Sequence, residues 1–406
     1  MIRAHKVRLN PTDEQEVYLR KACGISRFAF NWGLARWKEQ KEAGVGNYGA
    51  MALKKEFNGI KREQFPWVME VTKNATEDGF RRLGAALNNY YAGKKGQRKD
   101  KMGFPKFKSK KKAKPSFTMD YERFVVDGHW LKIQKLSTSI NMAEALRFVG
   151  KIKWGTISCL AGRWYIAISV EMDQPEPVNH IHESVGVDLG LKTLATLSDG
   201  REFESQKPLR SELNRLKCLN RSLSRKQRGS RRWWKAKEKL ARFHERIANR
   251  RNDAIHKMTD YIAKTYKIVG VEDLNVSGMA RNRRLALSIS DAAFGEILRQ
   301  QQYKSETSGG YTIKVGRFFA SSKTCSGCGY INRELTLSDR RWICSGCGTL
   351  HDRDFNASKN IEQEALRLAY GSLCPVVATS GKIARGQDVR PLGACLLYTS
   401  DAADEE

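Results

Sequence analysis

The stretch of sequence that decides the fold of this chain is Val185-Gly186-Val187-Asp188-Leu189-Gly190-Leu191. Apolar β-formers flank one carboxylate, and residues 193–197 continue as a second strand. Asp199-Gly200 is a two-residue hairpin signal before residues 201–203. An acid inside a buried strand is costly unless a metal ion or a cation stabilises it. Asp188 is therefore the first candidate site residue.

Two later acids have similar settings. Residues 266–271 (Tyr-Lys-Ile-Val-Gly-Val) read as a compact strand that places Glu272 at its end. Residues 351–361, which follow a group of cysteines, are predicted to start a helix, and they contain both Asp352 and Asp354. Each acid alone has an ordinary structural explanation, and their combination is what points to a site.

Carboxylate oxygens suit Mg²⁺, which keeps open positions for phosphate oxygens and water. Two such ions can activate a water and stabilise the leaving oxygen in an in-line displacement at a phosphodiester. The sequence therefore predicts a nuclease site at Asp188, Glu272 and Asp354. Asp352 competes for the third role, and Asn356 could assist there.

The net charge of the chain is its dominant bulk property. Its 406 residues include 73 Lys and Arg against 44 Asp and Glu, which gives a formal net charge of +29. This length predicts two to four domains, at roughly 100–200 residues per domain. So large a positive excess indicates a polyanionic partner, and nucleic acid is the one we expect. The sequence has no run of about 18 apolar residues that would favour a membrane.

Four of the nine cysteines form two C-x-x-C pairs, Cys325/Cys328 and Cys344/Cys347. A glycine in each pair allows a tight turn around a bound ion. Four thiolates at this spacing predict a structural zinc ribbon, a closed tetrahedral site, rather than a redox pair or a disulfide framework. The start of the chain, residues 1–6, has no apolar signal core, so we expect an intracellular protein.

The N-terminal part is predicted to be a strand followed by helices. Residues 2–9 suggest a short strand, and Thr12 and Gln15 have the capping-box spacing of a helix start. Two further helical stretches are expected within residues 11–92. Their periodic apolar residues are Phe30, Leu34 and Trp37 in the first, and Phe80, Leu83, Leu87 and Tyr90 in the second, after Pro66.

Residues 93–115 differ sharply in composition, with eleven Lys or Arg and an interruption at residues 103–108 (Gly-Phe-Pro-Lys-Phe-Lys). A solvated linker is one interpretation. Two aromatics among many cations also suit a nucleic-acid backbone with stacked bases, which is the interpretation we favour.

Residues 117–172 alternate with a period of two, which predicts an antiparallel β-unit that recruits the N-terminal strand into a small barrel. Residues 174–177 (Gln-Pro-Glu-Pro) are a plausible boundary. Residues 209–262 predict a long helical hairpin broken at Gly229-Ser230. Between residues 210 and 251, sixteen Lys or Arg stand against three Glu, which fits a helix lying along a nucleic-acid duplex better than a solvated face.

Five motifs carry a resemblance to a known family. They are Gly103-Phe104-Pro105-Lys106-Phe107, Gly186-Val187-Asp188-Leu189-Gly190, Val271-Glu272-Asp273-Leu274, Ser322-Lys323-Thr324-Cys325-Ser326-Gly327-Cys328-Gly329 and Asp352-Arg353-Asp354-Phe355-Asn356-Ala357. In this order, over residues 1–370, the chain resembles the TnpB (OrfB) proteins of bacterial insertion sequences, which are related to type V CRISPR effector nucleases.

The resemblance implies a multidomain α+β protein. A small wedge β-barrel would comprise residues 1–10 and 117–181, with a helical recognition domain and basic linker inserted at residues 11–116. An RNase H-like RuvC nuclease domain would comprise residues 182–324 and 349–370, with a zinc ribbon at residues 325–348.

The implied activity is RNA-guided cleavage of double- and single-stranded target DNA beside a short adjacent motif. The matching motifs assign catalysis to Asp188, Glu272 and Asp354, with two Mg²⁺ or Mn²⁺ ions, and Zn²⁺ to Cys325, Cys328, Cys344 and Cys347. A structured guide RNA would be the further partner. We expect a cytoplasmic, nucleoid-associated protein of a prokaryotic cell, with no membrane partner, and make no prediction of its oligomeric state.

The last part of the chain departs from the family. Residues 371–406 read as a tail, and residues 395–406 look like a translated sequencing adapter without function. Two other functions remain open: a guide-RNA-dependent DNA binder or repressor that does not cleave, and a DNA-binding transposition accessory that needs no RNA. The presence of all three acids argues against the first. The lack of an obvious transposase Tyr or His-rich site does not favour the second.

Overall fold

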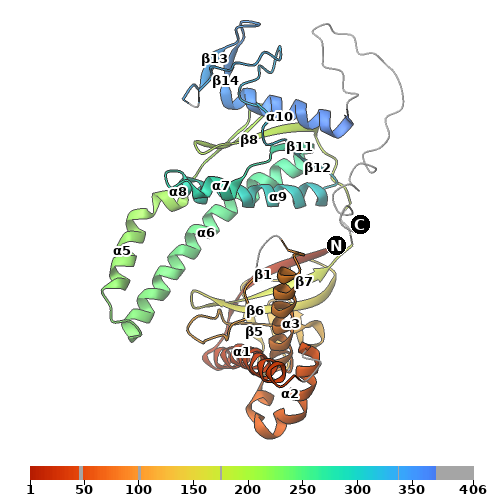
Figure 1. Cartoon of the computed structure of the whole chain (residues 1–406), viewed down its shortest axis with the longest axis vertical. Coiled ribbons are helices and arrows are strands. Elements are labelled where there is room, and N and C mark those ends of the chain that lie inside the picture. The colour runs from red at the N-terminus through yellow and green to blue at the C-terminus, as the bar shows by residue number, and fades with distance from the viewer. Residues whose placement is uncertain (45–48, 99–101, 174–175, 337, 372–406) are drawn as a thin grey trace. The chain divides into compact units, whose positions relative to one another are not determined.

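A computed structural model describes residues 1–44, 49–98, 102–173, 176–336 and 338–371. The chain divides into two compact units, drawn in Figure 1. The first unit comprises residues 1–174 and 234–242, and the second comprises residues 175–233 and 243–406. The tail beyond residue 371, including the predicted adapter segment, lies outside the described residues, as do Gln174 and Pro175 of the predicted boundary.

A seven-stranded antiparallel sheet forms the base of the first unit, in the order β2-β6-β7-β1-β5-β4-β3. The side chain of Phe124 in β3, at one edge, packs onto Gly155 in β6, next to the other edge, so the sheet is nearly closed. As predicted, the N-terminal strand is recruited between β7 and β5. The strands are β1 (Ile2–Asn10), β2 (Ser116–Asp120), β3 (Phe124–Asp127), β4 (Trp130–Ile133), β5 (Ile140–Met142), β6 (Lys151–Leu160) and β7 (Arg163–Glu171).

Three α-helices and a short 3-10 turn (η1, Pro66–Glu70) complete this unit: α1 (Asp13–Glu42), α2 (Ala50–Gln64) and α3 (Asn74–Lys94). Helices α1 and α3 contact β2 of the sheet, and α2 packs on α1 and α3. The predicted capping box at Thr12 and Gln15 opens α1. The predicted second helical stretch, however, is the continuation of α1, which runs on through Gly33. At Gly33 the side chains of Phe80 and Leu83 from α3 pack so closely that a Cβ atom would lie 2.8 Å from Leu83. That glycine is a helix-crossing residue and does not end the helix.

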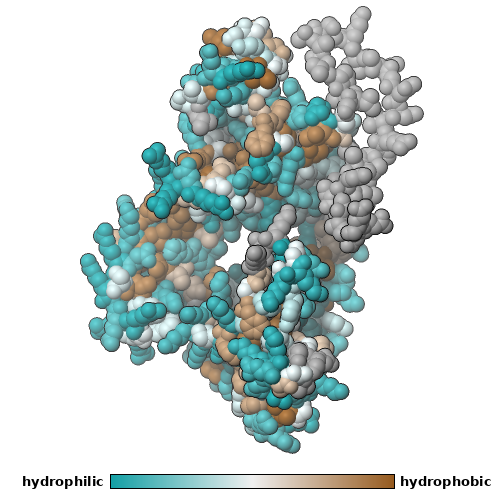
Figure 2. Space-filling model, in the orientation of Figure 1, coloured by the Kyte–Doolittle hydropathy of each residue, from teal (hydrophilic) through white to brown (hydrophobic). Residues whose placement is uncertain are grey.

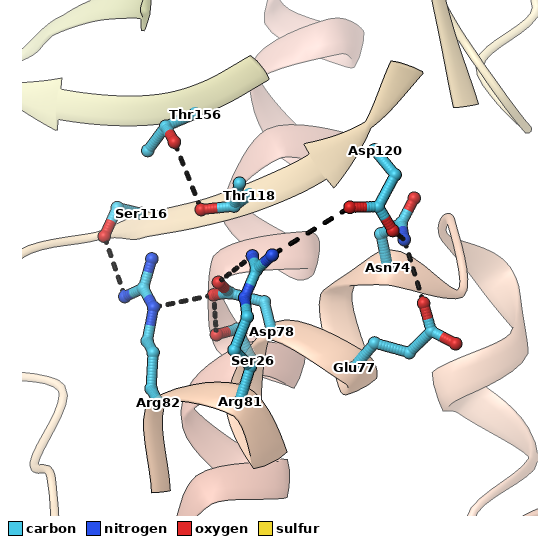
Figure 3. Close-up of polar contacts among 10 residues, drawn as sticks. All are labelled: Ser26, Asn74, Glu77, Asp78, Arg81, Arg82, Ser116, Thr118, Asp120 and Thr156. Carbon is cyan, nitrogen blue, oxygen red and sulfur yellow. Dashed lines mark hydrogen bonds and ion pairs between the residues drawn. The ribbon is translucent and has the colours of Figure 1, made fainter. Parts of the chain in front are cut away.

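A buried carboxylate joins the helices of the first unit to its sheet (Figure 3). Asp78 of α3 accepts hydrogen bonds from Ser26 of α1 at 2.7 Å and from Arg82 at 2.8 Å. Arg82 in turn donates to Ser116 at the start of β2 at 3.0 Å, and Arg81 lies between Asp78 and Asp120. Because a buried charge is tolerated when it is paired and hydrogen-bonded, this network fixes α3 against both α1 and β2.

The second unit is built on a five-stranded sheet in the order β10-β9-β8-β11-β12. Strands β8, β11 and β12 are parallel, whereas β9 is antiparallel to both of its neighbours. The predicted hairpin at Asp199-Gly200 joins β9 to β10. The strands are β8 (His182–Leu189), β9 (Thr193–Leu197), β10 (Glu202–Glu204), β11 (Tyr266–Glu272) and β12 (Tyr311–Val315).

Helices cover both faces of this sheet. Val185 and Val187 of β8, with their β11 counterparts Val269 and Val271, join one apolar cluster with residues of α6 and α9. Helix α10 lies across β8 and β11 (Figure 1). The helices are α4 (Pro208–Ser211), α5 (Leu213–Ser224), α6 (Arg231–Thr265), α7 (Val276–Arg281), α8 (Ala286–Ala292), α9 (Phe294–Thr307) and α10 (Arg353–Tyr370). Ser230 caps the start of α6, as the predicted break in the hairpin requires. Within the described residues, no helix is long and apolar enough to cross a membrane.

A small two-stranded sheet, β13 (Arg341–Ile343) with β14 (Leu350–Asp352), lies between β12 and α10 in the sequence. The prediction that a helix begins at His351 is wrong by two residues. His351 pairs with Trp342 in this sheet, and Asp352 is the N-cap of α10. The helix begins at Arg353 because the Asp352 carboxylate accepts hydrogen bonds from the first free backbone N–H groups.

Candidate functional site

Asp188 and Glu272 lie at the carboxyl ends of two neighbouring parallel strands. Val187 of β8 is in register with Val271 of β11, so the acid that follows each of them occupies the same level of the sheet. Side chains alternate between the two faces of a strand. Asp188 and Glu272 therefore project on the face opposite to the valines, which is the face that α10 covers.

Two glycines on this face let α10 come close. A Cβ atom on Gly186 would lie 1.9 Å from the carbonyl oxygen of Ser358, and one on Gly270 would lie 2.7 Å from Cβ of Ala365. Gly186 and Gly270 are register partners, and each precedes an acid of the site by two residues. The helix backbone therefore rests directly on the two strands that carry Asp188 and Glu272.

The electrostatic environment of Asp188 shows that all three predicted acids are neighbours. Burial first, and then the negative charges of Glu272 and Asp354, raise the pKa of Asp188 to about 7. Arg353 and Arg340 act in the opposite direction on that pKa. A buried carboxyl group that two other carboxylates surround favours either a proton or a metal cation. Asp354, in the first turn of α10, thus lies close enough to Asp188 to influence its charge.

The other candidate for the third acid has a different role in the structure. Asp352 accepts hydrogen bonds from the backbone N–H groups of Asp354 and Phe355, at 3.1 and 3.2 Å, and so caps α10. Asn356, predicted as an assistant at the acids, instead bonds to the backbone of Thr324 and Ser326. The charge of Asp354 acts on Asp188, whereas Asp352 and Asn356 bond to backbone groups, so we favour Asp354 as the third acid.

Two partners of the acids were not predicted from the sequence. Ser321 donates from its hydroxyl to one carboxylate oxygen of Glu272 at 2.6 Å. Arg340 forms an ion pair with Asp354 at 2.7 Å, and Arg353 forms a longer one at 3.3 Å. Nothing in the spacing of Ser321 or Arg340 connects them with the acids, because both residues lie outside the strand and helix patterns that mark Glu272 and Asp354.

The four predicted zinc ligands converge. Within the part of the chain that the structure describes, Cys325, Cys328, Cys344 and Cys347 form the one group of three or more His, Cys, Asp or Glu residues whose ligand atoms all lie within 4.8 Å of one another. The three site acids do not meet this criterion. The Sγ atoms of Cys328 and Cys344 are 3.5 Å apart, and those of Cys325 and Cys347 are 3.7 Å apart. Tetrahedral zinc with Zn–S bonds of about 2.3 Å needs sulfur atoms about 3.8 Å apart, so the residues fit this ion.

His351 is a further residue at the cysteines that the sequence did not suggest. Its Nε2 atom lies 3.0 Å from Sγ of Cys325, and its ring lies 4.8 Å from that of Trp342. Burial lowers the pKa of His351. A neutral imidazole that donates a hydrogen bond to a thiolate stabilises the negative charge of the sulfur. His351 thus supports the cysteine cluster from the strand that leads into α10.

Part of the basic stretch is anchored and is not a free linker. The side-chain amide of Asn31 in α1 makes two hydrogen bonds to the backbone of Lys108, at 2.9 and 2.8 Å. The ring of Phe104 packs against Trp37 of α1 and Tyr90 of α3, with ring centroids 5.3 and 5.2 Å apart. Residues 102–114, which we name the basic loop, therefore lie on the two helices in a defined position.

The surface of the basic loop combines charge with an exposed aromatic side chain. Phe107 is 54% exposed, and the ammonium group of Lys38 lies 4.9 Å from its ring. Burial and the positive charge of Arg82 lower the pKa of Lys108. The second basic region is the α5–α6 hairpin, which shows hydrophilic side chains along its outer edge beside apolar ones in Figure 2. Both regions have the composition expected of a polyanion-binding surface.

Three family models match the chain. A model of the OrfB proteins of IS605 elements, described as "Probable transposase", matches residues 167–283. One described as "Cas12f1-like, TNB domain" matches residues 294–361, and one described as "Helix-turn-helix domain" matches residues 1–44. In this structure residues 1–44 contain one strand and one long helix, β1 and α1.

Curated relatives match over most of their length. A protein of Streptomyces pristinaespiralis named "Putative RNA-guided DNA endonuclease" is 32% identical over 367 residues, which are 88% of each chain. The Escherichia coli (strain K12) protein named "Putative RNA-guided DNA endonuclease InsQ" is 31% identical over 378 residues, covering 89% of this chain and 91% of that protein. The chain belongs to the TnpB (OrfB) family. The resemblance that the five motifs predicted is thus confirmed.

Among solved structures, a cryo-EM structure of a Cas12f1–sgRNA–target DNA complex matches this TnpB-family chain with a TM-score of 0.50 and 14% identity. The match covers 86% of this chain and 82% of the Cas12f1 chain. At this identity the likeness shows the fold alone. This TnpB-family chain therefore has a Cas12f-like α+β fold with a nearly closed sheet, as the first part of the fold prediction expected.

Proposed function

We propose that this TnpB-family chain is an RNA-guided DNA endonuclease. The proposal is supported by Asp188 and Glu272 at the ends of two neighbouring parallel strands and by the effect of the Asp354 charge on Asp188, in a chain with a formal net charge of +29. The names of its curated relatives support the same activity. We assign the second unit to a RuvC nuclease domain of RNase H-like type. Its strand order, with three parallel strands and one antiparallel strand beside β8, supports this assignment.

The three acids would hold Mg²⁺ or Mn²⁺. When bound, two such ions activate a water and stabilise the leaving oxygen of the phosphodiester. The chain itself would contribute the three carboxylates. Burial and the two other acids disfavour the charge of Asp188, so a bound cation would stabilise it. Ser321 fixes one oxygen of Glu272, and α10 carries Asp354 to the site.

Zinc at the four cysteines would have a structural role. The ribbon has only a small apolar cluster, formed by Cys325, Leu335, Trp342 and Cys344. Because so small a core supplies little folding free energy, the metal has to supply it. We expect about one zinc per chain by elemental analysis. Active protein without zinc would contradict this role.

We propose that the nucleic-acid partners are a structured guide RNA and the target DNA. The basic loop and the α5–α6 hairpin supply far more cations than one short duplex contact requires. Residues 1–44, which match a helix-turn-helix model, form one strand and one long helix, and we recognise no compact sequence-reading module among the described residues. A protein that leaves sequence reading to base pairing binds RNA and heteroduplex through backbone and shape. The complex should therefore weaken steeply with salt, because counterions are released when it forms.

The test is cleavage of a plasmid by protein loaded with RNA transcribed beside its own gene. Cleavage should require Mg²⁺ or Mn²⁺, should follow the guide portion when that portion is reprogrammed, and should stop in Asp188→Ala. Binding of the matched DNA should persist in Asp188→Ala, because the basic surfaces are unchanged. Full-rate specific cleavage by RNA-free protein would reject guidance. Guide-dependent binding without cleavage, over a randomised adjacent motif, would favour the repressor function.

A further inference from the structure

The segment Ser321–Ser326, which we name the ribbon root, connects the cysteine cluster with the acid site. It follows β12 and ends within the first C-x-x-C pair. Its two ends belong to two different sites. Ser321 donates a hydrogen bond to Glu272, and Cys325 belongs to the four converging cysteines. Any displacement of this segment therefore reaches both places.

Two buried amides of α10 hold the ribbon root. Asn360, 3% exposed, donates to the carbonyl oxygens of Ser321 and Thr324 at 2.7 and 2.6 Å. Asn356, 1% exposed, accepts from the backbone N–H of Ser326 at 2.9 Å and donates to the carbonyl of Thr324 at 2.7 Å. Residues four apart lie on the same helix face, so the two side chains form one row of hydrogen bonds along the root.

At these two positions, α10 contacts the ribbon root through buried amide groups and not through apolar side chains. Burying an amide is unfavourable unless its groups are hydrogen-bonded, and both Asn356 and Asn360 use their amides on backbone groups that have no place in a regular element. An irregular backbone held in this manner has a defined position. The position matters here because the hydroxyl of Ser321, whose own carbonyl Asn360 holds, is the group that contacts Glu272.

The same helix carries the third acid. Asp354 is in the first turn of α10, one turn or less before Asn356, so the row of amides links the helix that presents Asp354 to the segment that orients Glu272. Ser321 engages one oxygen of the Glu272 carboxylate and so sets the direction of the other. The acids of the site are thereby held relative to one another by hydrogen bonds outside the acids themselves.

We propose that Ser321 and Asn360 are positioning residues of the acid site, with Asn356 holding the ribbon root at its cysteine end. Ser321 orients the Glu272 carboxylate for a divalent cation, and Asn360 fixes Ser321. This inference rests on the proposed function and deepens it, because it names groups that act on metal affinity and do not touch the nucleic acid.

The test compares Ser321→Ala and Asn360→Ala with a control, Gln363→Ala. Gln363 also reaches the ribbon root from α10, but its amide donates to the carbonyl of Ser326 at 3.3 Å from an exposed position. Partners that orient a metal-binding side chain typically affect metal affinity about 10- to 100-fold. We expect Ser321→Ala to raise the Mg²⁺ concentration for half-maximal cleavage by about 10-fold. Its cleavage rate at saturating Mg²⁺ should stay within about twofold of the parental rate if the hydroxyl acts through metal affinity alone.

A second readout does not depend on cleavage. Mn²⁺ binding to RNA-loaded protein, followed by electron paramagnetic resonance, should weaken in Ser321→Ala and in Asn360→Ala but not in Gln363→Ala. Zinc content should remain equal in all four proteins. In Asn360→Ala, amide hydrogen exchange should also accelerate across the ribbon root. If Asn360→Ala does not fold, Ser321→Ala alone decides, because it removes one hydroxyl and leaves the amides in place.

Two outcomes would overturn the inference. One is an unchanged Mg²⁺ requirement and unchanged Mn²⁺ binding in Ser321→Ala. The other is an equal shift in Gln363→Ala, which would assign the effect to general loosening of the ribbon. Failure of the parental protein to cleave would instead count against the proposed function, while the Mn²⁺ comparison would still decide whether Ser321 positions Glu272.

Discussion

At the scale of single residues, Asp188 has a charge that its surroundings disfavour. The usual pKa of an aspartate is 3.8, and in this fold it is about 7, because of burial first and of Glu272 and Asp354 second. Such a group is expected at a site that binds a cation, since a bound cation compensates the unfavourable negative charge. Without a cation, ionisation of Asp188 lowers the free energy of unfolding of the protein.

This gives a prediction for pH dependence in chelator. The folded protein binds the Asp188 proton more tightly than the unfolded chain does, so the group stabilises the fold at low pH, and this contribution is lost as pH rises from about 4 to about 7. Asp188→Asn cannot ionise and so avoids this loss of stability. The substitution should stabilise the metal-free protein by about 2–4 kcal/mol above pH 7. Thermal unfolding should show a gain that shrinks at pH 5. A variant less stable than the parent at pH 8 would contradict the expectation.

Substitutions of the neighbouring acids Asp352 and Asp354 should have different effects on stability and on cleavage. Asp352→Ala removes the N-cap of α10 and should lower stability by about 0.5–2 kcal/mol while cleavage remains. Asp354→Asn should abolish cleavage and leave the melting temperature nearly unchanged. Measuring both properties on both variants tests the assignment. A fully folded Asp352→Ala variant that does not cleave would assign the role of third acid to Asp352.

At the scale of elements, the sequence was informative wherever periodicity and turn chemistry were strong. The hairpin at Asp199-Gly200, the strand ending at Glu272 and the recruitment of residues 2–9 into the barrel were all predicted. The sequence predicted two helices where the structure has the single long helix α1. Inside α1, Gly33 lies where the side chains of α3 pack closely, and this packing depends on residues far away in the sequence.

Only part of the candidate site was predicted, because some of its residues are marked by local sequence and others only by tertiary contacts. Acids at strand ends and paired cysteines are marked by local context, so Asp188, Glu272 and the four cysteines could be proposed from the sequence. Ser321, Arg340 and His351 act through tertiary contacts, and a serine or an arginine in an irregular segment carries no local signal. Asn356 was singled out as a possible assistant to the acids, and its bonds to the backbone of Thr324 and Ser326 could not be read from the sequence.

The close approach of α10 to the sheet yields a prediction for Gly186. Gly186→Ala places a Cβ atom 1.9 Å from the Ser358 carbonyl oxygen, so α10 must move away from the sheet. Overpacking of this kind typically costs about 1–3 kcal/mol, and Asp354 moves with the helix. Both the melting temperature and the cleavage rate should fall. Gly316→Ala is the matched control, because nothing lies within 4 Å of its added carbon. Equal behaviour of the two variants would rule out the close packing.

The anchoring of the basic loop yields another prediction. Asn31→Ala removes both hydrogen bonds to Lys108 but no charge. We expect faster amide exchange across residues 102–114 and guide-RNA binding weakened by about 2- to 10-fold, since two hydrogen bonds of about 1 kcal/mol each are lost. The slope of affinity against salt should not change. Lys106→Ala, by contrast, should reduce that slope by about one ion if Lys106 contacts a phosphate. Unchanged exchange in Asn31→Ala would show that Phe104 alone holds the loop.

At the scale of the whole molecule, the net charge should act with opposite sign on the free and the bound protein. A charge of +29 repels itself, and salt screens that repulsion within about 10 Å at 0.1 M. Raising salt from 50 to 300 mM should therefore raise the melting temperature of the free protein. The same change should lower that of the RNA complex, because RNA dissociates more readily. Scanning calorimetry of both samples tests this. A free protein that salt destabilises would contradict it.

The position of α10 along the chain has a consequence for how the protein is made. Strands β8 and β11 leave the ribosome well before α10 does, and until residues 353–370 emerge, Gly186 and Gly270 have no helix to cover them. A nascent chain at that stage has two of the three acids and an uncovered sheet face, which is a state prone to aggregate. The three acids are therefore all present only after α10 has been synthesised. An unfinished chain that stops before α10 would lack Asp354, one of the acids to which we assign the proposed cleavage.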